Sequence, residues 1–318
     1  MAAIDFDIRR LERRARSLDP KWTIGTRAGI RILDLPTARV RVRVAGHGKM
    51  TIVFATDMPN VVESYDDVIR LLETDFRVVV FEQVGFGFSY PKRGFSFTRR
   101  AYVDATTDML NALGMAPYTL VSPCVNVFTA LSVAKENKSL VECLVLMQAI
   151  EWNDQRKWAG WAIDRFMFAA AFMPVYGKKI VSTPYLGQWA WAAAERKFPR
   201  RTHPHVIYRS KERPELFRRI ADPLYAAHEH GACTCFGSSF QNYFDAADQI
   251  PVVSQPTLIL WATADRGHAK ANPKALRAYA PHASWVEVPD TGHHLDLENP
   301  QAVTHEIRRF MDGREYAP

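Results

Sequence analysis

The sequence predicts an α/β protein in which a mostly parallel sheet is covered by helices on both faces and is interrupted by a helical insertion. Residues 51–150 alternate between short apolar runs of strand length and segments with apolar residues at helical spacing. Residues 151–250 lose this alternation, and it resumes after residue 250. A chain of 318 residues is long enough for one large domain with such an insertion.

The elements of the sheet region follow one another as strand and helix, which favours parallel pairing of the strands. The expected strands are 51–55, 77–81, 118–121, 140–147, 257–261 and 285–288, and the expected helices are 61–72, 101–113, 127–135, 273–279 and 301–311.

The insertion is predicted to be a helical cap, because it is rich in aromatic residues and has no alternating strand pattern. Its aromatic residues either line an apolar pocket or form the core of the cap. The chain is thus divided into a basic segment (1–50) that leads into the sheet, a core (51–150 and 251–318) and a cap (151–250). The tryptophans of the cap are Trp152, Trp158, Trp161, Trp189 and Trp191.

The net charge of +7 is concentrated in the N-terminal segment. Residues 1–50 contain 12 Lys and Arg against 5 Asp and Glu, which leaves 29 of each kind in the rest of the chain. The arginines are either a docking face for an acidic partner or an ordinary solvated face, and we expect the second. Most of them lie in a predicted helix and in a strand where they alternate with valine: Arg9, Arg10, Arg13, Arg14, Arg16, Arg39, Arg41 and Arg43.

The composition argues against several other classes of protein. No run of about 18 apolar residues predicts a membrane span, and no motif for nucleic-acid binding accompanies the basic residues. The N-terminus has early acidic residues and lacks the apolar core of a signal peptide. Four cysteines in a chain of this length do not suggest a disulfide framework. We therefore expect a cytoplasmic protein.

The most informative segment is Ser122-Pro123-Cys124-Val125-Asn126, which lies between a predicted strand and a predicted helix. A strand that turns sharply into a helix exposes the side chain at the apex of the turn, as in the nucleophile elbow G-x-S-x-G. Here Cys124 takes the position of the serine, and Ser122 and Asn126 replace the two glycines. Asn tolerates left-handed backbone better than most residues. Taken alone, the segment is equally consistent with a buried structural cysteine.

Two later segments place an acid and a histidine after predicted strands. Asp265 ends the apolar run 260–265, and His293 follows strand 285–288. The order of nucleophile, acid and histidine is that of the α/β-hydrolases. Residues 50–312 resemble this fold: Phe81-Glu82-Gln83-Val84-Gly85-Phe86-Gly87-Phe88-Ser89 is similar to its D-x-x-G-x-G-x-S turn, and Gly292-His293 with Glu298-Asn299-Pro300 is similar to its G-H-x(4)-E-x-P ending.

The resemblance implies a cap between the sixth and seventh strands of the fold and a triad of Cys124 as nucleophile, His293 as base and Asp265 as orienting acid. An imidazole and a helix N-terminus beside the sulfur would favour the thiolate, and the acid would hold the histidine in the correct tautomer. His294 is the second choice for the base, and Glu151 is the second choice for the acid.

The largest departure from the family pattern lies where the family has H-G-x-P-G and this chain has Thr56-Asp57-Met58-Pro59-Asn60. By position, the backbone N–H groups of Met58 and Val125 would hold the oxyanion, and backbone donors do not depend on side-chain identity. Asp57, however, would repel a developing negative charge unless its side chain points away.

Other candidate ligands are less persuasive. The segment H-x-H-x(2)-C-x-C, formed by His228, His230, Cys233 and Cys235, has a shorter cysteine spacing than usual zinc sites. Cys143 lies within a predicted strand and is expected in the core. We therefore expect neither a metal nor a cofactor.

These features predict a hydrolase or acyltransferase that acts on an ester or thioester with an apolar acyl group, through an acyl intermediate on Cys124. The basic N-terminal segment adds a second hypothesis, an acidic acyl carrier protein as partner. The altered elbow and oxyanion segments leave two alternatives: a non-catalytic binding protein with this fold, and a lyase or cyclase that uses His293 as base.

Overall fold

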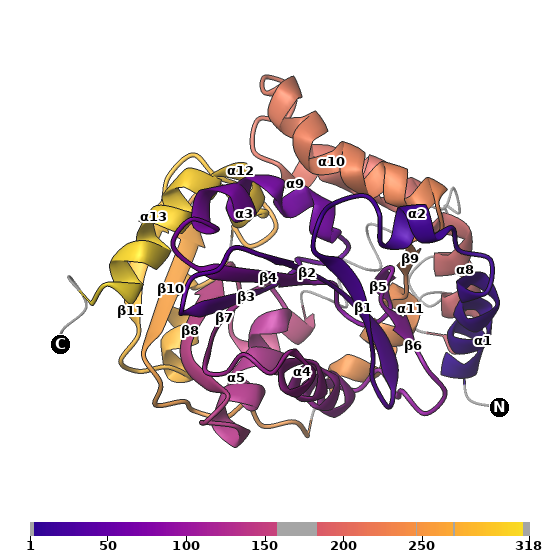
Figure 1. Ribbon diagram of the computed structural model, residues 1–318, viewed down its shortest axis with the longest axis horizontal. Coiled ribbons are helices and arrows are strands. Elements are labelled where there is room, and N and C mark those ends of the chain that lie inside the picture. The colour runs from indigo at the N-terminus through magenta and orange to yellow at the C-terminus, as the bar shows by residue number, and fades with distance from the viewer. Residues whose placement is uncertain (1–2, 158–182, 246, 270, 314–318) are drawn as a thin grey trace.

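The computed structural model describes residues 3–157, 183–245, 247–269 and 271–313. A twisted sheet forms the centre of the molecule (Figure 1). Helices α3 (Asp66–Leu72), α12 (Leu295–Glu298) and α13 (Pro300–Met311) lie over one face, and α4 (Arg99–Leu113) and α5 (Asn126–Glu136) lie over the other. The expected fold class, an α/β protein with helices on both faces of the sheet, is therefore confirmed.

The sheet has nine strands. Their order is β1 (Ile30–Asp34), β2 (Ala38–Ala45), β4 (Arg77–Phe81), β3 (Thr51–Ala55), β7 (Tyr118–Pro123), β8 (Val141–Met147), β10 (Thr257–Ala262) and β11 (Ser284–Val288), with β6 (Tyr90–Pro91) paired to β2. The strands from β4 to β11 in this order are parallel to their neighbours, whereas β2 is antiparallel to β1, β4 and β6.

All six strands expected in the sheet region are present, and two of the expected helices differ in kind. The segment expected as one helix over 61–72 is a 3₁₀ turn, η1 (Val62–Tyr65), followed by α3. The segment expected over 273–279 is a 3₁₀ helix, η2 (Pro273–Ala278). Apolar spacing does not distinguish α from 3₁₀ turns over such short lengths.

The core lies on both faces of the sheet because the central strands are apolar at every position. In β3, Ile52 and Phe54 belong to the apolar cluster that includes α3 and α13. Val53 and Ala55 belong to the cluster that includes α4 and α5. Successive side chains of a strand point to opposite faces, so a continuous apolar run supplies both layers.

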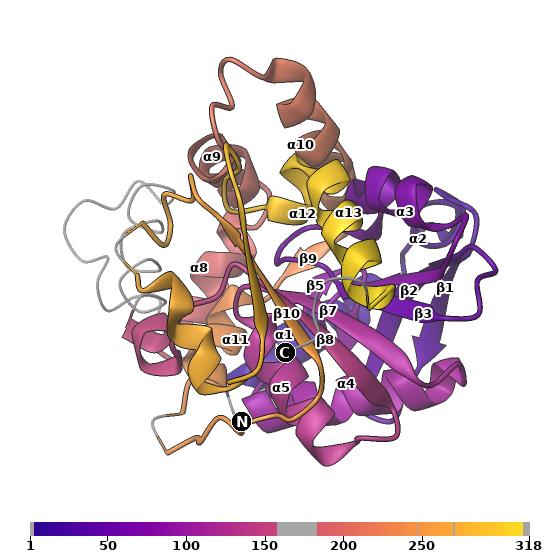
Figure 2. The same cartoon turned by 90° about the vertical axis from the view of Figure 1, so that its left-hand side faces the viewer.

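The described part of the insertion is largely helical, as expected. It contains α8 (Leu186–Ala194), α9 (Lys197–Val206), α10 (Pro214–Glu229) and α11 (Phe236–Tyr243), with β9 (Cys233–Thr234) paired to β5 (Phe86–Gly87). Helices α9 and α10 lie side by side at one end of the molecule (Figure 2). Trp191 is buried and Trp189 is exposed, whereas Trp158 and Trp161 lie outside the described residues.

Two arginines of α1 (Ile4–Ala15) attach the N-terminal segment to the insertion. Arg10 and Arg14 both form ion pairs with the buried carboxylate of Glu195, at 2.7 and 2.5 Å. The expectation that these arginines form a solvated face is therefore wrong. Their apolar neighbours on α1 bring them into contact with α8, where an acidic residue neutralises them.

Arg41 of β2 also contradicts the expectation of a solvated face, because its side chain is fully buried. Its guanidinium pairs with Glu82 at 2.8 Å and with Glu63, and it donates to the Thr23 carbonyl at 2.7 Å. Burial raises the pKa of Glu82 to about 6, although Arg41 acts in the opposite direction. The arginine thus compensates two carboxylates that would otherwise be buried without a cation.

Glu82 is the residue that replaces Asp in the D-x-x-G-x-G-x-S turn. It accepts a hydrogen bond from the backbone N–H of Phe88 at 2.7 Å, so the carboxylate closes the turn. Gly87 has a φ of 57°, and a Cβ at this position would lie 2.4 Å from Glu82 Oε2. The turn therefore requires glycine at residue 87.

None of the described helices is both long and apolar enough to cross a membrane.

Candidate active site

The candidate site lies at the carboxyl ends of adjacent parallel strands. Asp57 follows β3, Cys124 follows β7, Gln148 follows β8, Asp265 follows β10 and His293 follows β11. The carboxyl ends of parallel strands meet at one edge of the sheet, which is where open α/β sheets bind ligands. This topology brings together residues that are far apart in the sequence.

Cys124 is at the apex of a sharp turn between β7 and α5. Its φ is 49°, a left-handed conformation that is uncommon for residues other than glycine and that concentrates at functional sites. The backbone N–H of Cys124 donates to the Met147 carbonyl at 2.8 Å. Asn126, in contrast, is the first residue of α5, and its side-chain amide donates to the Thr56 carbonyl at 3.0 Å. The left-handed residue of the elbow is therefore the cysteine itself and not Asn126.

Asp265 and His293, predicted as partners, are hydrogen-bonded. Oδ2 of Asp265 lies 2.9 Å from Nδ1 of His293, and Oδ1 accepts from the backbone N–H of Gly267 at 2.7 Å. Burial raises the pKa of Asp265, but His293 and the hydrogen bonds to the carboxylate outweigh burial and hold that pKa well below its ordinary value. Asp265 is therefore ionised at neutral pH and can orient the imidazole.

Sequence reasoning missed two further partners of Asp265. Nδ1 of His268 lies 2.9 Å from the same carboxylate oxygen, and Nε2 of Gln148 donates to it at 2.8 Å. The amide oxygen of Gln148 accepts from the backbone N–H of Ala262 at 2.6 Å, which ties β8 to β10. His268 follows Asp265 by three residues in the loop after β10, so the sequence shows that the two residues are neighbours. The fold of the loop decides that the ring of His268 points to the carboxylate of Asp265.

The sulfur of Cys124 lies within 4.8 Å of a ring nitrogen of His293. Burial raises the pKa of the Cys124 thiol, and although His293 lowers it, the net shift is upward. This differs from the expectation that the imidazole and the helix N-terminus dominate. Burial lowers the pKa of His293, but the carboxylate of Asp265 and the neighbouring sulfur outweigh burial and raise that pKa well above its ordinary value. The thiol thus keeps its proton more tightly than an ordinary cysteine, and the ring has an increased affinity for a proton.

Asp57 points into the site and not away from it. Its Oδ2 lies 3.5 Å from Nε2 of His293 and 3.0 Å from Nδ1 of His294. His293 consequently has one carboxylate on each side of its ring, Asp265 at Nδ1 and Asp57 at Nε2. His294, the second choice for the base, hydrogen-bonds with Asp57.

Comparison with known proteins decides the family. A sequence profile for the alpha/beta hydrolase fold matches residues 52–300. The chain belongs to the alpha/beta hydrolase fold family. A search of curated proteins by sequence found no match.

Solved structures with the same fold include several enzymes. An esterase from Thermogutta terrifontis has a TM-score of 0.63 and 20% identity, over 89% of this chain and 98% of the esterase. An epoxide hydrolase from Bacillus megaterium has a TM-score of 0.69 and 16% identity, over 89% of this chain and the whole of the other. An enol-lactonase from Burkholderia xenovorans has a TM-score of 0.64 and 17% identity, also over 89% and 100%. At these identities the similarity extends to the fold alone.

In this alpha/beta hydrolase the loop that carries His293 is shaped by Glu298, the acid of the G-H-x(4)-E-x-P ending. The carboxylate of Glu298 accepts from the backbone N–H groups of Gly292 at 3.0 Å and of His294 at 3.2 Å. A Cβ on Gly292 would lie 2.6 Å from the Val206 carbonyl. The motif is therefore a device that positions the histidine.

The two candidate oxyanion donors, the backbone N–H groups of Val125 and Met58, have different surroundings. The backbone N–H of Val125 lowers the pKa of the Cys124 thiol. The N–H of Met58 forms no hydrogen bond within the described part of the chain. Glu151, the second choice for the acid, accepts from the Tyr279 hydroxyl at 2.8 Å and from the Asn153 N–H at 2.7 Å, so its carboxylate is occupied outside the site.

The H-x-H-x(2)-C-x-C segment does not assemble into a ligand cluster among the described residues. Nε2 of His228 lies 3.3 Å from the Thr234 hydroxyl. The ring of His230 stacks on Trp22, with centroids 3.9 Å apart. Cys143, expected in the core, is only partly buried, and burial raises its pKa to about 11.

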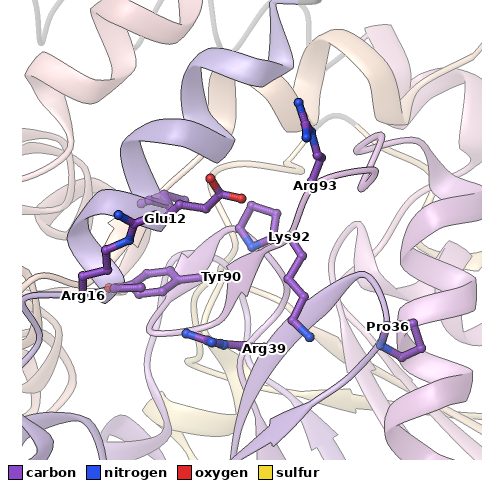
Figure 3. A pocket seen from close by; sticks show the side chains of 10 residues that line it. Glu12, Arg16, Pro36, Arg39, Tyr90, Lys92 and Arg93 are labelled. Atoms are coloured by element: carbon purple, nitrogen blue, oxygen red, sulfur yellow. The ribbon is translucent and has the colours of Figure 1, made fainter.

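A cavity of about 490 Å³ lies between α1 and the segment that includes β6, and none of the candidate site residues lines it (Figure 3). Four cationic side chains and one carboxylate line it: Arg16, Arg39, Lys92, Arg93 and Glu12. Lys92 and Arg39 pair with Asp34 at 2.8 and 3.3 Å. Arg16 directly follows α1 and Arg93 follows β6, so the cavity joins two separate basic parts of the sequence.

Proposed function

We propose that this alpha/beta hydrolase is a hydrolase or acyltransferase that forms a covalent acyl thioester on Cys124. The observation that carries the proposal is that the cysteine at the apex of the elbow lies close to His293, which is hydrogen-bonded to Asp265. A nucleophile beside a base, which is in turn oriented by an acid, is the arrangement used for nucleophilic catalysis. The proposed substrate is an ester or thioester with an apolar acyl group.

In the first step the sulfur of Cys124 attacks the substrate carbonyl while His293 accepts the thiol proton. The carbonyl oxygen takes the negative charge, and the N–H groups of Val125 and Met58 are its proposed donors. The intermediate then collapses, the bond to the alcohol or thiol leaving group breaks, and His293 returns the proton to that group. Water, an alcohol, an amine or a thiol next attacks the acyl thioester with His293 as base, which frees Cys124.

The two carboxylates beside His293 suit the imidazolium that forms in each half-reaction. Asp265 stabilises it from the Nδ1 side and Asp57 from the Nε2 side. A negative charge on Asp57 disfavours an oxyanion close to it, and a positive ring beside Asp57 offsets that charge. The reaction therefore depends on transfer of the proton to His293 before or during attack.

The same carboxylate favours a second candidate function, a lyase or cyclase in which His293 removes a proton from the substrate. Such a reaction needs no tetrahedral oxyanion, and the carboxylate of Asp57 would stabilise the imidazolium that results. It would depend on His293 and not on Cys124, which separates the two proposals experimentally.

We further propose an acidic acyl carrier protein as the donor of the acyl group, in the cytoplasm. The support is the basic cavity beside α1, where Arg16 and Arg93 form no ion pair within the described part of the chain. Complementary charge would steer an acidic partner to this face.

The test is intact-mass measurement after brief exposure to short and medium acyl thioesters, with Cys124→Ala as control. A mass gain of one acyl group that is absent from the variant supports the covalent mechanism. Turnover that Cys124→Ala retains and a His293→Gln variant loses would support the lyase or cyclase. Neither adduct nor turnover across the panel would favour a non-catalytic binding protein.

A further inference from the structure

Three potential metal ligands of different types converge on one point of the site. The side chains of Asp57, Cys124 and His293 are buried, and their ligand atoms all lie within 4.8 Å of one another. Nε2 of His293 and Oδ2 of Asp57 are 3.5 Å apart. Bond lengths of about 2.0–2.3 Å in a tetrahedral zinc site correspond to ligand atoms about 3.3–3.8 Å apart, so the three atoms need to move little to share one ion.

We propose that Asp57, Cys124 and His293 form a zinc site with one open coordination position, and that Zn²⁺ bound there masks the Cys124 sulfur. Zinc accepts thiolate, imidazole and carboxylate ligands, and three protein ligands with an open fourth position are found in its catalytic and exchangeable sites. Binding requires that the thiol lose its proton to solvent as the sulfur–zinc bond forms.

The surroundings of the three side chains have the form of an outer ligand shell. Metal-binding histidines almost always donate their second ring N–H to a carboxylate or carbonyl, which fixes the tautomer. Asp265 accepts from Nδ1 of His293 at 2.9 Å and leaves Nε2 for the metal. Nδ1 of His294 lies 3.0 Å from Asp57 Oδ2 and orients this carboxylate.

Charge also favours a cation at this point. Within the described residues, neither Asp57 nor Asp265 forms an ion pair with lysine or arginine, and their cationic partners are histidines alone. A divalent ion would balance the thiolate and the Asp57 carboxylate together. Buried charges are stable only when they are paired or coordinate a metal.

A second group of potential ligands, Asp265, His268 and His293, shares one residue with the first. The two imidazoles of this group already use Nδ1 to contact the same carboxylate oxygen, each at 2.9 Å. Hydrogen bonds to the acid account for that arrangement, so we assign the metal to the group that contains the thiol.

The site is tested on the reduced, full-length protein after removal of metals with a chelator. Calorimetric titration with Zn²⁺ should show one ion per chain, with proton release that scales with the ionisation enthalpy of the buffer. Titration with Co²⁺ should produce a thiolate-to-cobalt charge-transfer band in the near ultraviolet. In the wild-type protein, Zn²⁺ should also protect Cys124 from alkylation by iodoacetamide, as mapped by peptide mass.

Variants locate the ion. Cys124→Ser should abolish the charge-transfer band, and Asp57→Asn should weaken zinc binding by at least about 10-fold, as should Asp265→Asn through the outer shell. Cys143→Ser and Cys233→Ser replace thiols outside the cluster and should leave binding unchanged. No binding of Zn²⁺, a cobalt band that survives in Cys124→Ser, or alkylation of Cys124 at an unaltered rate in the presence of zinc would each overturn the proposal.

Inhibition of acylation by zinc at Cys124 rests on the proposed function, but the zinc site itself does not. These experiments need no substrate, so the two proposals fail separately. Acylation of Cys124 without zinc binding would overturn the metal site alone, and zinc binding without acylation by any thioester would overturn the proposed function alone.

Discussion

The carboxylate of Asp57 lies 3.5 Å from Nε2 of His293, on the side of the ring that is not bound by Asp265. This carboxylate occupies the position where the family pattern has the glycine of H-G-x-P-G. The site therefore combines a cysteine, the proposed nucleophile, with an imidazole held between two negative groups.

The reactivity of Cys124 should respond to Asp57. Burial raises the pKa of this thiol and Asp57 adds to the rise, so alkylation by iodoacetamide should reach half its maximal rate at a higher pH than for an ordinary cysteine. Asp57→Asn removes a negative charge close to the sulfur. Because this removal stabilises the thiolate, the midpoint of the alkylation rate should shift to lower pH. Peptide mass resolves Cys124 from the other cysteines. Asp290→Asn, which neutralises an exposed carboxylate close to His293 in the sequence, is the matched control, and an equal shift in both variants would contradict the prediction.

Asp265→Asn should reduce the rate of acylation by roughly 10³- to 10⁴-fold, because an amide stabilises the wrong tautomer of a catalytic histidine. The measurement is the rate of adduct formation with a reactive thioester, followed by mass. His268→Gln, which changes the other ring on the same carboxylate, should cost much less because His268 is not bonded to the nucleophile. A larger loss in His268→Gln than in Asp265→Asn would show that the roles of the two residues are assigned incorrectly.

Arg41→Met should lower the free energy of unfolding by about 3–5 kcal/mol, because it leaves the buried carboxylates of Glu63 and Glu82 without their cation. Urea unfolding provides the measurement. Arg39→Met changes an exposed arginine of the same strand and should alter stability by about 0.5 kcal/mol or less. Combining Arg41→Met with Glu63→Gln and Glu82→Gln should recover part of the loss; no recovery would mean that Arg41 acts through packing and not through charge.

Reversal of charge in the basic cavity should weaken binding of an acidic acyl carrier protein. Arg16→Glu with Arg93→Glu should lower the affinity and its dependence on salt, while acylation of Cys124 by a small thioester should stay unchanged. The measurement is titration of the carrier at two ionic strengths. Arg9→Glu makes the same change of charge on α1 outside the lining of the cavity, so an equal effect of Arg9→Glu would argue against docking in this cavity.

Much of the architecture follows from local pattern. The strand expected over 77–81 is β4 with the same bounds. A short uninterrupted apolar run between polar segments is typical of a strand that is buried on both faces of a parallel sheet. Cys124, Asp265 and His293 were selected because each follows such a run, and strand ends in a parallel sheet meet at one edge. Where the pattern was short, as in 61–72, the type of helix did not follow from it.

The order of the layers, the α/β-hydrolase family and the strand ends at which chemistry is expected could thus be predicted from the chain, since these depend on periodicity and on residues close together in the sequence. Tertiary structure alone decided that Asp57 turns toward His293, that His268 shares the acid with it, and that Arg41 is buried between two glutamates. Each of these depends on contacts between distant segments. A buried charge is stable only when a group from another element neutralises it. The local sequence pattern does not show which distant residue will lie beside it.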